Sequence, residues 1–214
     1  MKVQGFAVGP FQENSYLVID EAARRAVLID PGDEAARLLR AVDASGATLD
    51  AIWVTHGHMD HVGAIAAILR AKPVPVLMHP GDLPLYRAAA ELGLAFEATV
   101  EQPPDPTAPL ADGQHLRVGT LEFTVMHAPG HSPGHVVIHG NGVAFVGDCL
   151  FAGSIGRTDL PLSSGAQLTA TLERIAALDP ATVVYSGHGP PTTIARERES
   201  NPFLNGAARI ATGR

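Results

Sequence analysis

The seven residues Thr55-His56-Gly57-His58-Met59-Asp60-His61 are the most informative stretch of this sequence. They directly follow the apolar run 51–54, which predicts a buried strand that ends in a loop. Positions 56–61 hold three imidazoles and one carboxylate, which are the usual ligands for zinc and its first-row neighbours. Neighbouring side chains point in different directions, so a single metal would not readily use all four. The stretch therefore predicts two metal ions side by side.

Three more residues of the ligand type stand where other strands are expected to end. Asp148 follows the apolar run 143–146 and a glycine, and His188 follows the run 182–187. His131 lies in the histidine-rich loop 127–135. Strands that each end in such a residue are expected to converge at one edge of a β architecture, so these three residues are predicted to complete the site. The remaining histidines outside any motif are expected to be ordinary core or surface residues: His79, His115 and His139.

Length and composition favour one enzyme domain spanning residues 1–214. Hydrophobic residues make up 46% of the chain, enough for a sizeable core. No apolar run approaches the roughly 20 residues that span a membrane, and the N-terminus has no signal-peptide pattern. The single cysteine, Cys149, excludes an intramolecular disulfide and is expected to be a small buried residue. A cytoplasmic location without membrane partners is therefore expected.

The charge of the chain argues against a nucleic-acid partner. The formal net charge is −7, and Lys2 and Lys72 are the only lysines. A protein that grips a phosphate backbone is expected to carry a basic stripe, which is absent from the sequence. The expected partner is a small molecule, and the sequence does not indicate an oligomeric state.

Hydrophobic periodicity predicts alternating strands and helices along the chain. Residues 101–109 contain four prolines and are expected to form a surface connector. Residues 73–78 are expected to begin as a loop and end as a short strand. The other strands are predicted near 2–8, 14–20, 25–30, 51–54, 114–118, 121–126, 135–139, 143–146 and 182–185. Helices are predicted near 34–45, 82–92 and 167–177. A further helix is predicted to begin near His61, and a C-terminal helix is predicted to begin at about residue 194.

Seven segments resemble the metallo-β-lactamase superfamily and, within it, the short glyoxalase II-like (hydroxyacylglutathione hydrolase-like) proteins. They extend from about residue 14 to about residue 204. The resemblance implies an α+β fold, a four-layer αββα sandwich of the metallo-β-lactamase type. The segments are Leu28-Ile29-Asp30-Pro31-Gly32, the stretch 55–61, Pro129-Gly130-His131-Ser132-Pro133-Gly134-His135, Gly147-Asp148, Gly156-Arg157-Thr158-Asp159, Gly187-His188-Gly189-Pro190 and Arg198-Glu199-Ser200-Asn201-Pro202-Phe203.

The same resemblance implies a ligand set for two divalent metal ions, with zinc expected and iron or manganese also accepted by such ligands. Asp148 is expected to bridge the two ions, and Asp60 to orient the hydroxide that they share. That hydroxide would attack a polarised carbonyl carbon. The first ion would be held by His56, His58 and His131, and the second by Asp60, His61 and His188.

A thioester such as S-lactoylglutathione is the expected substrate. An unperturbed thiol has a pKa near about 8.5, so a thiolate leaves without much protonation. Full-length glyoxalase II enzymes bind glutathione largely through a C-terminal helical domain, which this chain, ending at Arg214, is expected to lack. Arg157 is the candidate cation facing the substrate. The alternative is that Arg157 forms a salt bridge with Asp159 and fixes its loop.

Supporting residues and other functions are also expected. Asp30 is placed to accept a hydrogen bond from a metal-binding imidazole, and His127 and His135 to brace the loop around His131. One alternative is a persulfide dioxygenase-like oxidoreductase with a single iron. Its ligands would be His56, His131 and Asp148. Further alternatives are hydrolysis of a lactone or another ester, and a non-catalytic metal-binding module.

Overall fold

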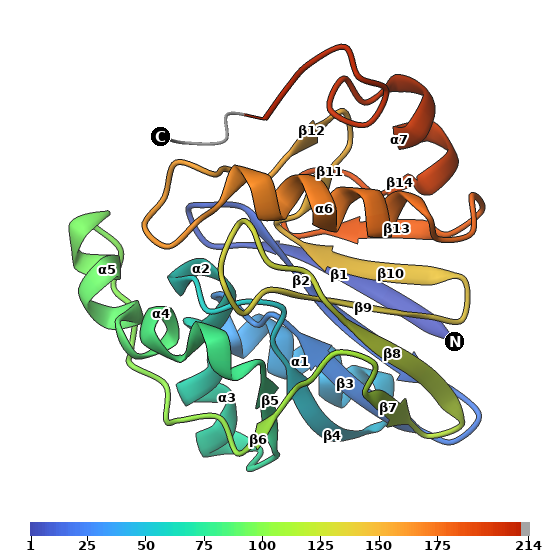
Figure 1. Ribbon diagram of the computed structural model, residues 1–214. Coiled ribbons are helices and arrows are strands. Elements are labelled where there is room, and N and C mark those ends of the chain that lie inside the picture. The colour runs from blue at the N-terminus through green and yellow to red at the C-terminus, as the bar shows by residue number, and fades with distance from the viewer. Residues whose placement is uncertain (211–214) are drawn as a thin grey trace.

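The computed structural model describes residues 1–210, and its framework is a pair of six-stranded sheets (Figure 1). The first sheet has the order β1-β2-β3-β4-β5-β6, with strands Lys2–Val8, Glu13–Asp20, Arg25–Ile29, Thr48–Trp53, Val76–Met78 and Ala108–Pro109. The second has the order β14-β13-β10-β9-β8-β7, with β7 His115–Val118, β8 Leu121–His127, β9 Val136–Gly140, β10 Val143–Gly147, β13 Val183–Ser186 and β14 Thr192–Thr193. A small hairpin follows β10 and consists of β11 (Leu150–Phe151) and β12 (Ser154–Ile155).

Helices follow the strands of both sheets. In the first half they are α1 (Ala35–Ser45), α2 (Met59–Val62), α3 (Ile65–Ala71), the 3₁₀ turn η1 (Pro80–Asp82), α4 (Leu83–Arg87) and α5 (Ala89–Ala95). In the second half they are α6 (Gly165–Ala176) and α7 (Ile194–Ser200). The side chains of Ser164 and Thr193 accept hydrogen bonds from backbone N–H groups in the first turns of α6 and α7, and so they cap these helices.

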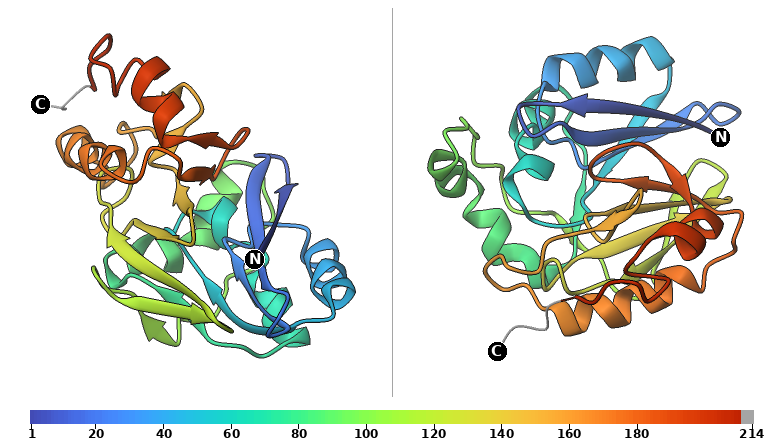
Figure 2. Two further views of the ribbon diagram at one scale, coloured as in Figure 1. Left: turned by 90° about the vertical axis from the view of Figure 1, so that its right-hand side faces the viewer. Right: turned by 90° about the horizontal axis from the view of Figure 1, so that it is seen from above.

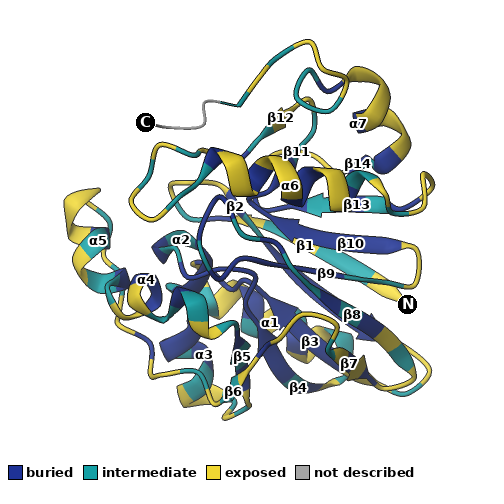
Figure 3. Cartoon of the chain, in the orientation of Figure 1, coloured by how far each residue is buried: buried dark blue, intermediate teal, exposed yellow. Residues whose placement is uncertain are grey.

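Alternation along the strands produces four layers. In β2, Leu17 belongs to a buried cluster that includes Leu38 of α1, whereas its neighbour Val18 belongs to the cluster between the sheets with Phe145 of β10. In β10, Ala144 faces the opposite way and belongs to a third cluster with α6. The right view of Figure 2 shows α1 and α6 on opposite outer sides, and Figure 3 shows exposed residues along the outer face of α6. The predicted αββα sandwich is confirmed.

Three local predictions differ from the structure. Residues 108–109 form an edge strand, β6, although the proline-rich segment was expected to be only a connector. An edge strand tolerates this proline because Thr107 and Leu110 on either side donate the hydrogen bonds to β5. The predicted helix 82–92 is divided at Ala88 into α4 and α5, and α2 begins at Met59 rather than His61.

The fold brings the ends of its parallel strands to one edge. Strands β3, β4 and β5 run parallel in one sheet, and β10 and β13 run parallel in the other. Asn14, at the start of β2, joins the sheets there: its backbone N–H donates to the Gly187 carbonyl at 2.7 Å. Loops that follow these strands therefore meet at this edge. Within residues 1–210, no helix is both long and apolar enough to cross a membrane.

Candidate metal centre

The histidine-rich stretch leaves its sheet at the end of β4 and turns directly into α2. His56 is fully buried in the loop, and His58 is the residue directly before α2, where its side chain makes no capping hydrogen bond. Only glycine fits between them, because a Cβ on Gly57 would lie 2.8 Å from the Asp82 carbonyl oxygen. Asp60 and His61 follow within α2, where each residue rotates about 100° from the last. Loop and helix together thus turn side chains from neighbouring positions toward two separate points.

The other three predicted residues reach the same place from the second sheet. Asp148 directly follows β10, and His188 lies two residues after the parallel neighbour strand β13. His131 lies in the loop between β8 and β9. The structure therefore brings together all seven residues that the sequence singled out as metal ligands.

Two clusters form among these side chains. The first consists of His56, His58 and His131, and the second of Asp60, His61 and His188; in each, one ligand atom per residue lies within 4.8 Å of the others. In the first cluster, His58 Nδ1 lies 2.9 Å from His131 Nε2. In the second, Asp60 Oδ2 lies 3.3 Å from His188 Nε2 and 3.9 Å from His61 Nε2.

Asp148 lies between the clusters. Its Oδ2 is 3.6 Å from His131 Nε2 of the first cluster and 3.6 Å from His188 Nε2 of the second. Its Oδ1 is 3.5 Å from His61 Nε2. One carboxylate therefore faces both groups with separate oxygens.

The hydrogen bonds of the rings fix which nitrogen each imidazole presents. His131 Nδ1 donates to the Arg157 carbonyl oxygen at 2.9 Å. The Thr55 hydroxyl donates to Asp30 at 2.5 Å, so it accepts from His56 Nδ1 at 3.1 Å. His61 Nδ1 lies 3.1 Å from Asp30 Oδ2 and donates to it. In all three rings Nδ1 thus donates to an acceptor and Nε2 faces the clusters, which is the arrangement of a metal-binding imidazole.

Unpartnered atoms support the fit of this donor set to a metal. Among the described residues, His56 Nε2, His61 Nε2 and Asp148 Oδ1 are buried and have no hydrogen-bond partner. Buried polar atoms without partners are rare and costly, because their interaction with water is lost without replacement. One cation in each cluster would provide a partner for all three atoms.

Asp30 supports the site rather than adding a ligand to it. Its distances to His56 and His61 would allow a third metal group. Both of its oxygens, however, accept hydrogen bonds from Thr55, at 2.7 Å from the backbone N–H and 2.5 Å from the hydroxyl. Asp30 also approaches His61 through Nδ1, the nitrogen on the side away from the second cluster. This is the position predicted for an acceptor that orients a ligand.

The two clusters differ in protonation when no metal is bound. Burial and neighbouring imidazoles lower the pKa of His56 and His58, that of His58 to about 4. Burial also acts to lower the pKa of His61, but the carboxylates of Asp148 and Asp60 outweigh it and raise that pKa well above its ordinary value. Burial would raise the pKa of Asp148, yet the adjacent imidazoles hold it below its usual range. Without metal, the rings of His56 and His58 are therefore neutral, whereas His61 holds a proton.

The flanking histidines lie next to the clusters without joining them. His135 stacks on His56 with ring centroids 4.8 Å apart, and its Nε2 accepts the backbone N–H of Asp148 at 3.1 Å. His127 Nε2 donates to the Pro133 carbonyl at 2.9 Å. These contacts agree with the bracing role expected for both residues. Cys149 is buried against His135, as expected for a small core residue.

Two buried carboxylates at the site did not stand out in the sequence. Asp82 is completely buried, and its carboxylate contacts both histidine loops. Glu13 is 1% exposed, and its Oε1 lies 3.6 Å from His61 Nδ1. Burial raises the pKa of Glu13 well above its ordinary value. Asp30 directly follows β3, whereas Asp82 lies at the end of the turn η1, four residues after β5, so it lacks the strand-end position that made Asp30 a candidate.

Arg157 forms the ion pair that was the alternative to substrate binding. Its Nε and Nη2 donate to the two Asp159 oxygens at 2.9 Å each, and both side chains are exposed. Its backbone carbonyl is the acceptor that orients His131. A substrate-facing role for the Arg157 side chain stays a prediction.

Comparison with known proteins agrees with this geometry. The protein-family model of the metallo-β-lactamase superfamily matches residues 8–188 of this chain. Hydroxyacylglutathione hydrolase GloC of Haemophilus influenzae is 35% identical over 96% of this chain and 99% of its own length. TTHA1623, crystallised in a di-iron-bound form, is 45% identical with a TM-score of 0.87, covering 94% of this chain and all of its own. The B3 metallo-β-lactamase BLEG-1 is 35% identical with a TM-score of 0.88, and the match covers 95% of this chain and 99% of BLEG-1.

Proposed function

Because this chain belongs to the metallo-β-lactamase superfamily, we propose that it is a dinuclear metal-dependent hydrolase of small-molecule thioesters such as S-lactoylglutathione. The observation that carries the proposal is the position of Asp148, whose two oxygens face two separate clusters of ligand-type side chains. A single metal would use one cluster and leave the buried Nε2 of the other unpartnered.

In this proposal, the ligands divide as the clusters do. His56, His58 and His131 hold one ion, and Asp60, His61 and His188 hold the other, with Asp148 shared. When bound, such a pair lowers the pKa of a shared water toward about 7 and polarises a carbonyl oxygen. Zinc is the expected metal, and the di-iron form of TTHA1623 makes iron the second to test.

The exposure of Asp60 and His188 favours substrate approach over these two residues of the second cluster. The side chains of His61 and His131 are 0% and 3% exposed, whereas those of Asp60 and His188 are 18% and 30% exposed. A carbonyl group would therefore arrive on the side of His188, where Asp60 is placed to orient the attacking water. Asp30 and Thr55 hold the buried rings in position from the opposite side.

The leaving group favours a thioester over an amide. An ordinary thiol has a pKa of about 8.5, so a thiolate leaves with little protonation, whereas an amine needs a general acid. All seven ligand-type side chains would be occupied with metal, so none is left to protonate a leaving group. The 35% identity to a hydroxyacylglutathione hydrolase supports the same choice. The proposal takes residues 1–214 as one cytoplasmic domain, of which 211–214 lie outside the described residues.

Release of free thiol from S-lactoylglutathione by zinc-loaded and iron-loaded protein tests this function. We expect saturable release by the wild type and only the background rate for Asp148→Ala. The matched control is Glu122→Gln, which removes an exposed carboxylate on β8 and is expected to leave the rate unchanged.

Other substrates separate the alternatives. Oxygen uptake with glutathione persulfide by iron-loaded protein, without thioester cleavage, would favour a persulfide dioxygenase-like enzyme. A lactone and a β-lactam are the other two substrates to test. The β-lactam is included because the similar protein BLEG-1 is a B3 metallo-β-lactamase. Faster turnover of either ring substrate than of any thioester would contradict the proposed substrate class.

A further inference from the structure

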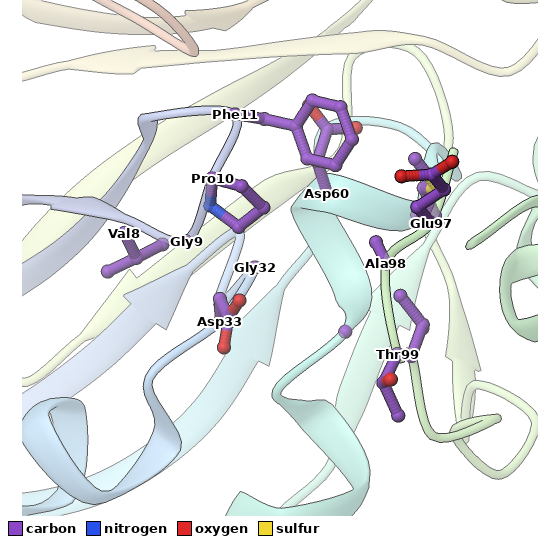
Figure 4. A pocket seen from close by; sticks show the side chains of 13 residues that line it. Val8, Gly9, Pro10, Phe11, Gly32, Asp33, Asp60, Glu97, Ala98 and Thr99 are labelled. Carbon is purple, nitrogen blue, oxygen red and sulfur yellow. The ribbon is translucent and has the colours of Figure 1, made fainter. Parts of the chain in front are cut away.

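A cavity of about 200 Å³ lies directly beside Asp60 (Figure 4). One wall is the turn between β1 and β2, with Pro10 and Phe11, and the opposite wall is the segment 97–100 that follows α5. Figure 4 shows Asp60 between these walls. The cavity therefore adjoins the proposed metal centre at Asp60.

We propose that this cavity binds the acyl group of the substrate and selects uncharged acyl chains over anionic ones. The inference rests on the proposed thioester hydrolysis and specifies the substrate class. It follows from the size of the cavity, the apolar side chains of its buried part and the charge of its outer part.

The size of the cavity decides which part of a thioester it can hold. Pockets that enclose a whole drug-sized ligand have volumes of roughly 300–1,000 Å³. A cavity of about 200 Å³ is smaller than that range and would not hold a tripeptide thiol such as glutathione. A short acyl chain fits, and its carbonyl carbon would then lie on the Asp60 side of the cavity.

The lining of the cavity combines polar and apolar side chains, and its buried part is apolar. Val8 and Met59 form its buried part and are 1% and 7% exposed. Pro10, Phe11 and Val100 add apolar surface nearer to solvent. Burial of one methylene group in such a lining is expected to raise kcat/KM about fourfold.

An aromatic contact joins the two walls at the outer end. The rings of Phe11 and Phe96 meet edge to face, with centroids 6.2 Å apart, and both side chains are exposed to solvent. Phe11 comes from the turn after β1, and Phe96 directly follows α5. In this proposal, Phe11, which lines the cavity and is held by this contact, would limit the length of the acyl chain.

Away from Asp60, which would be bound to metal, the charged side chains that line the cavity are negative. They are Asp33 and Glu97, and no lysine or arginine lines the cavity. Neither Asp33 nor Glu97 forms an ion pair with any residue in the described part of the chain. A carboxylate at the end of an acyl chain would therefore enter a field of like charge, which lowers its affinity.

A series of glutathione thioesters that differ only in the acyl group tests the inference. For the metal-loaded wild type, we expect kcat/KM to rise from acetyl through propionyl to butyryl, and the succinyl thioester to be turned over more slowly than the butyryl one. The glutathione portion is common to all four, so its own charges cancel in these ratios. Ala98→Phe, which fills the cavity, is expected to reverse the preference for butyryl over acetyl.

Charge variants supply the sharper comparison. Asp33→Asn combined with Glu97→Gln is expected to raise the succinyl-to-butyryl ratio of kcat/KM about tenfold. The control removes two exposed carboxylates elsewhere, Glu122→Gln with Glu199→Gln, and is expected to leave the ratio unchanged. An equal change in both double variants would show a general charge effect and overturn the inference.

The outcomes distinguish this inference from the proposed function. Hydrolysis of none of the four thioesters would overturn thioester hydrolysis and the acyl-binding role together. Hydrolysis with a ratio that Asp33→Asn and Glu97→Gln do not alter would overturn the acyl-binding role alone. Circular dichroism of each variant establishes that its fold is retained.

Discussion

The Ser132 hydroxyl donates a 2.6 Å hydrogen bond to the completely buried Asp82 carboxylate. The same carboxylate accepts the backbone N–H groups of Gly57, at 2.9 Å, and Gly134, at 2.5 Å. One side chain after β5 thereby joins the loop of His56 and His58 to the loop of His131. Asp82 touches none of the proposed ligands' metal-binding atoms, yet it fixes the spacing of the first cluster.

Replacement of Asp82 is expected to damage both stability and metal binding. Asp82→Ala leaves two buried N–H groups without acceptors, which costs about 3 kcal/mol or more in unfolding free energy. Loss of such a support typically weakens metal binding about 10-fold or more. Urea denaturation and metal titration measure the two effects. Ser132→Ala removes a single hydrogen bond and is expected to cost only about 1 kcal/mol. Equal effects of the two substitutions would contradict the role assigned to Asp82.

Gly156 is required for space next to Asp148. A Cβ at this position would lie 1.7 Å from the Asp148 carbonyl oxygen and 3.2 Å from His131 Nδ1. Gly156→Ala is therefore expected to displace both residues and to lower metal content. Gly153→Ala is the control, because its Cβ meets nothing within 4 Å and only its φ of +76° is strained. Gly153→Ala is expected to lose some stability but to keep its metal, as elemental analysis would show.

The two metal positions are expected to respond differently to pH. The raised pKa values of His61 and His188, due chiefly to nearby carboxylates that outweigh burial, mean that a metal must displace protons from the second cluster. Affinity there should fall as the pH falls below neutral. Burial lowers the pKa of His56 and lowers that of His58 to about 4, so these two ligands stay neutral and the first metal is expected to be kept to lower pH. Metal titrations at pH 7.5 and pH 6 measure this, and parallel loss of both metals would contradict it.

Most strands and helices and the proposed ligands were predictable from local sequence, whereas the αββα arrangement was predicted from the family resemblance. Strands such as β2 and β10 are apolar, bounded by turns, and need no distant information to be recognised. His56, His58, Asp60 and His61 are close in the sequence, so their meeting in space follows from a single strand and a short helix. His131, Asp148 and His188 depended on a further rule, the convergence of strand ends at one edge of the fold.

Features that depend on tertiary partners were not predicted. The two-residue strands β6 and β14 are strands only because a neighbour accepts or donates their hydrogen bonds. The role of Asp82 arises from two loops far away in the sequence, and a single aspartate in a loop carries no sign of it. The cavity beside Asp60 is likewise assembled from separate segments, near residues 10, 33, 60 and 98, whose apposition no local pattern encodes.

The number of metal ions per chain tests the central claim most directly. Protein dialysed with zinc and then freed of unbound metal is expected to hold two ions per chain by elemental analysis. His188→Ala removes a ligand from the second cluster alone and is expected to hold one. One ion per chain in the wild type, unchanged in His188→Ala, would contradict the dinuclear centre and favour a single metal held by His56, His131 and Asp148.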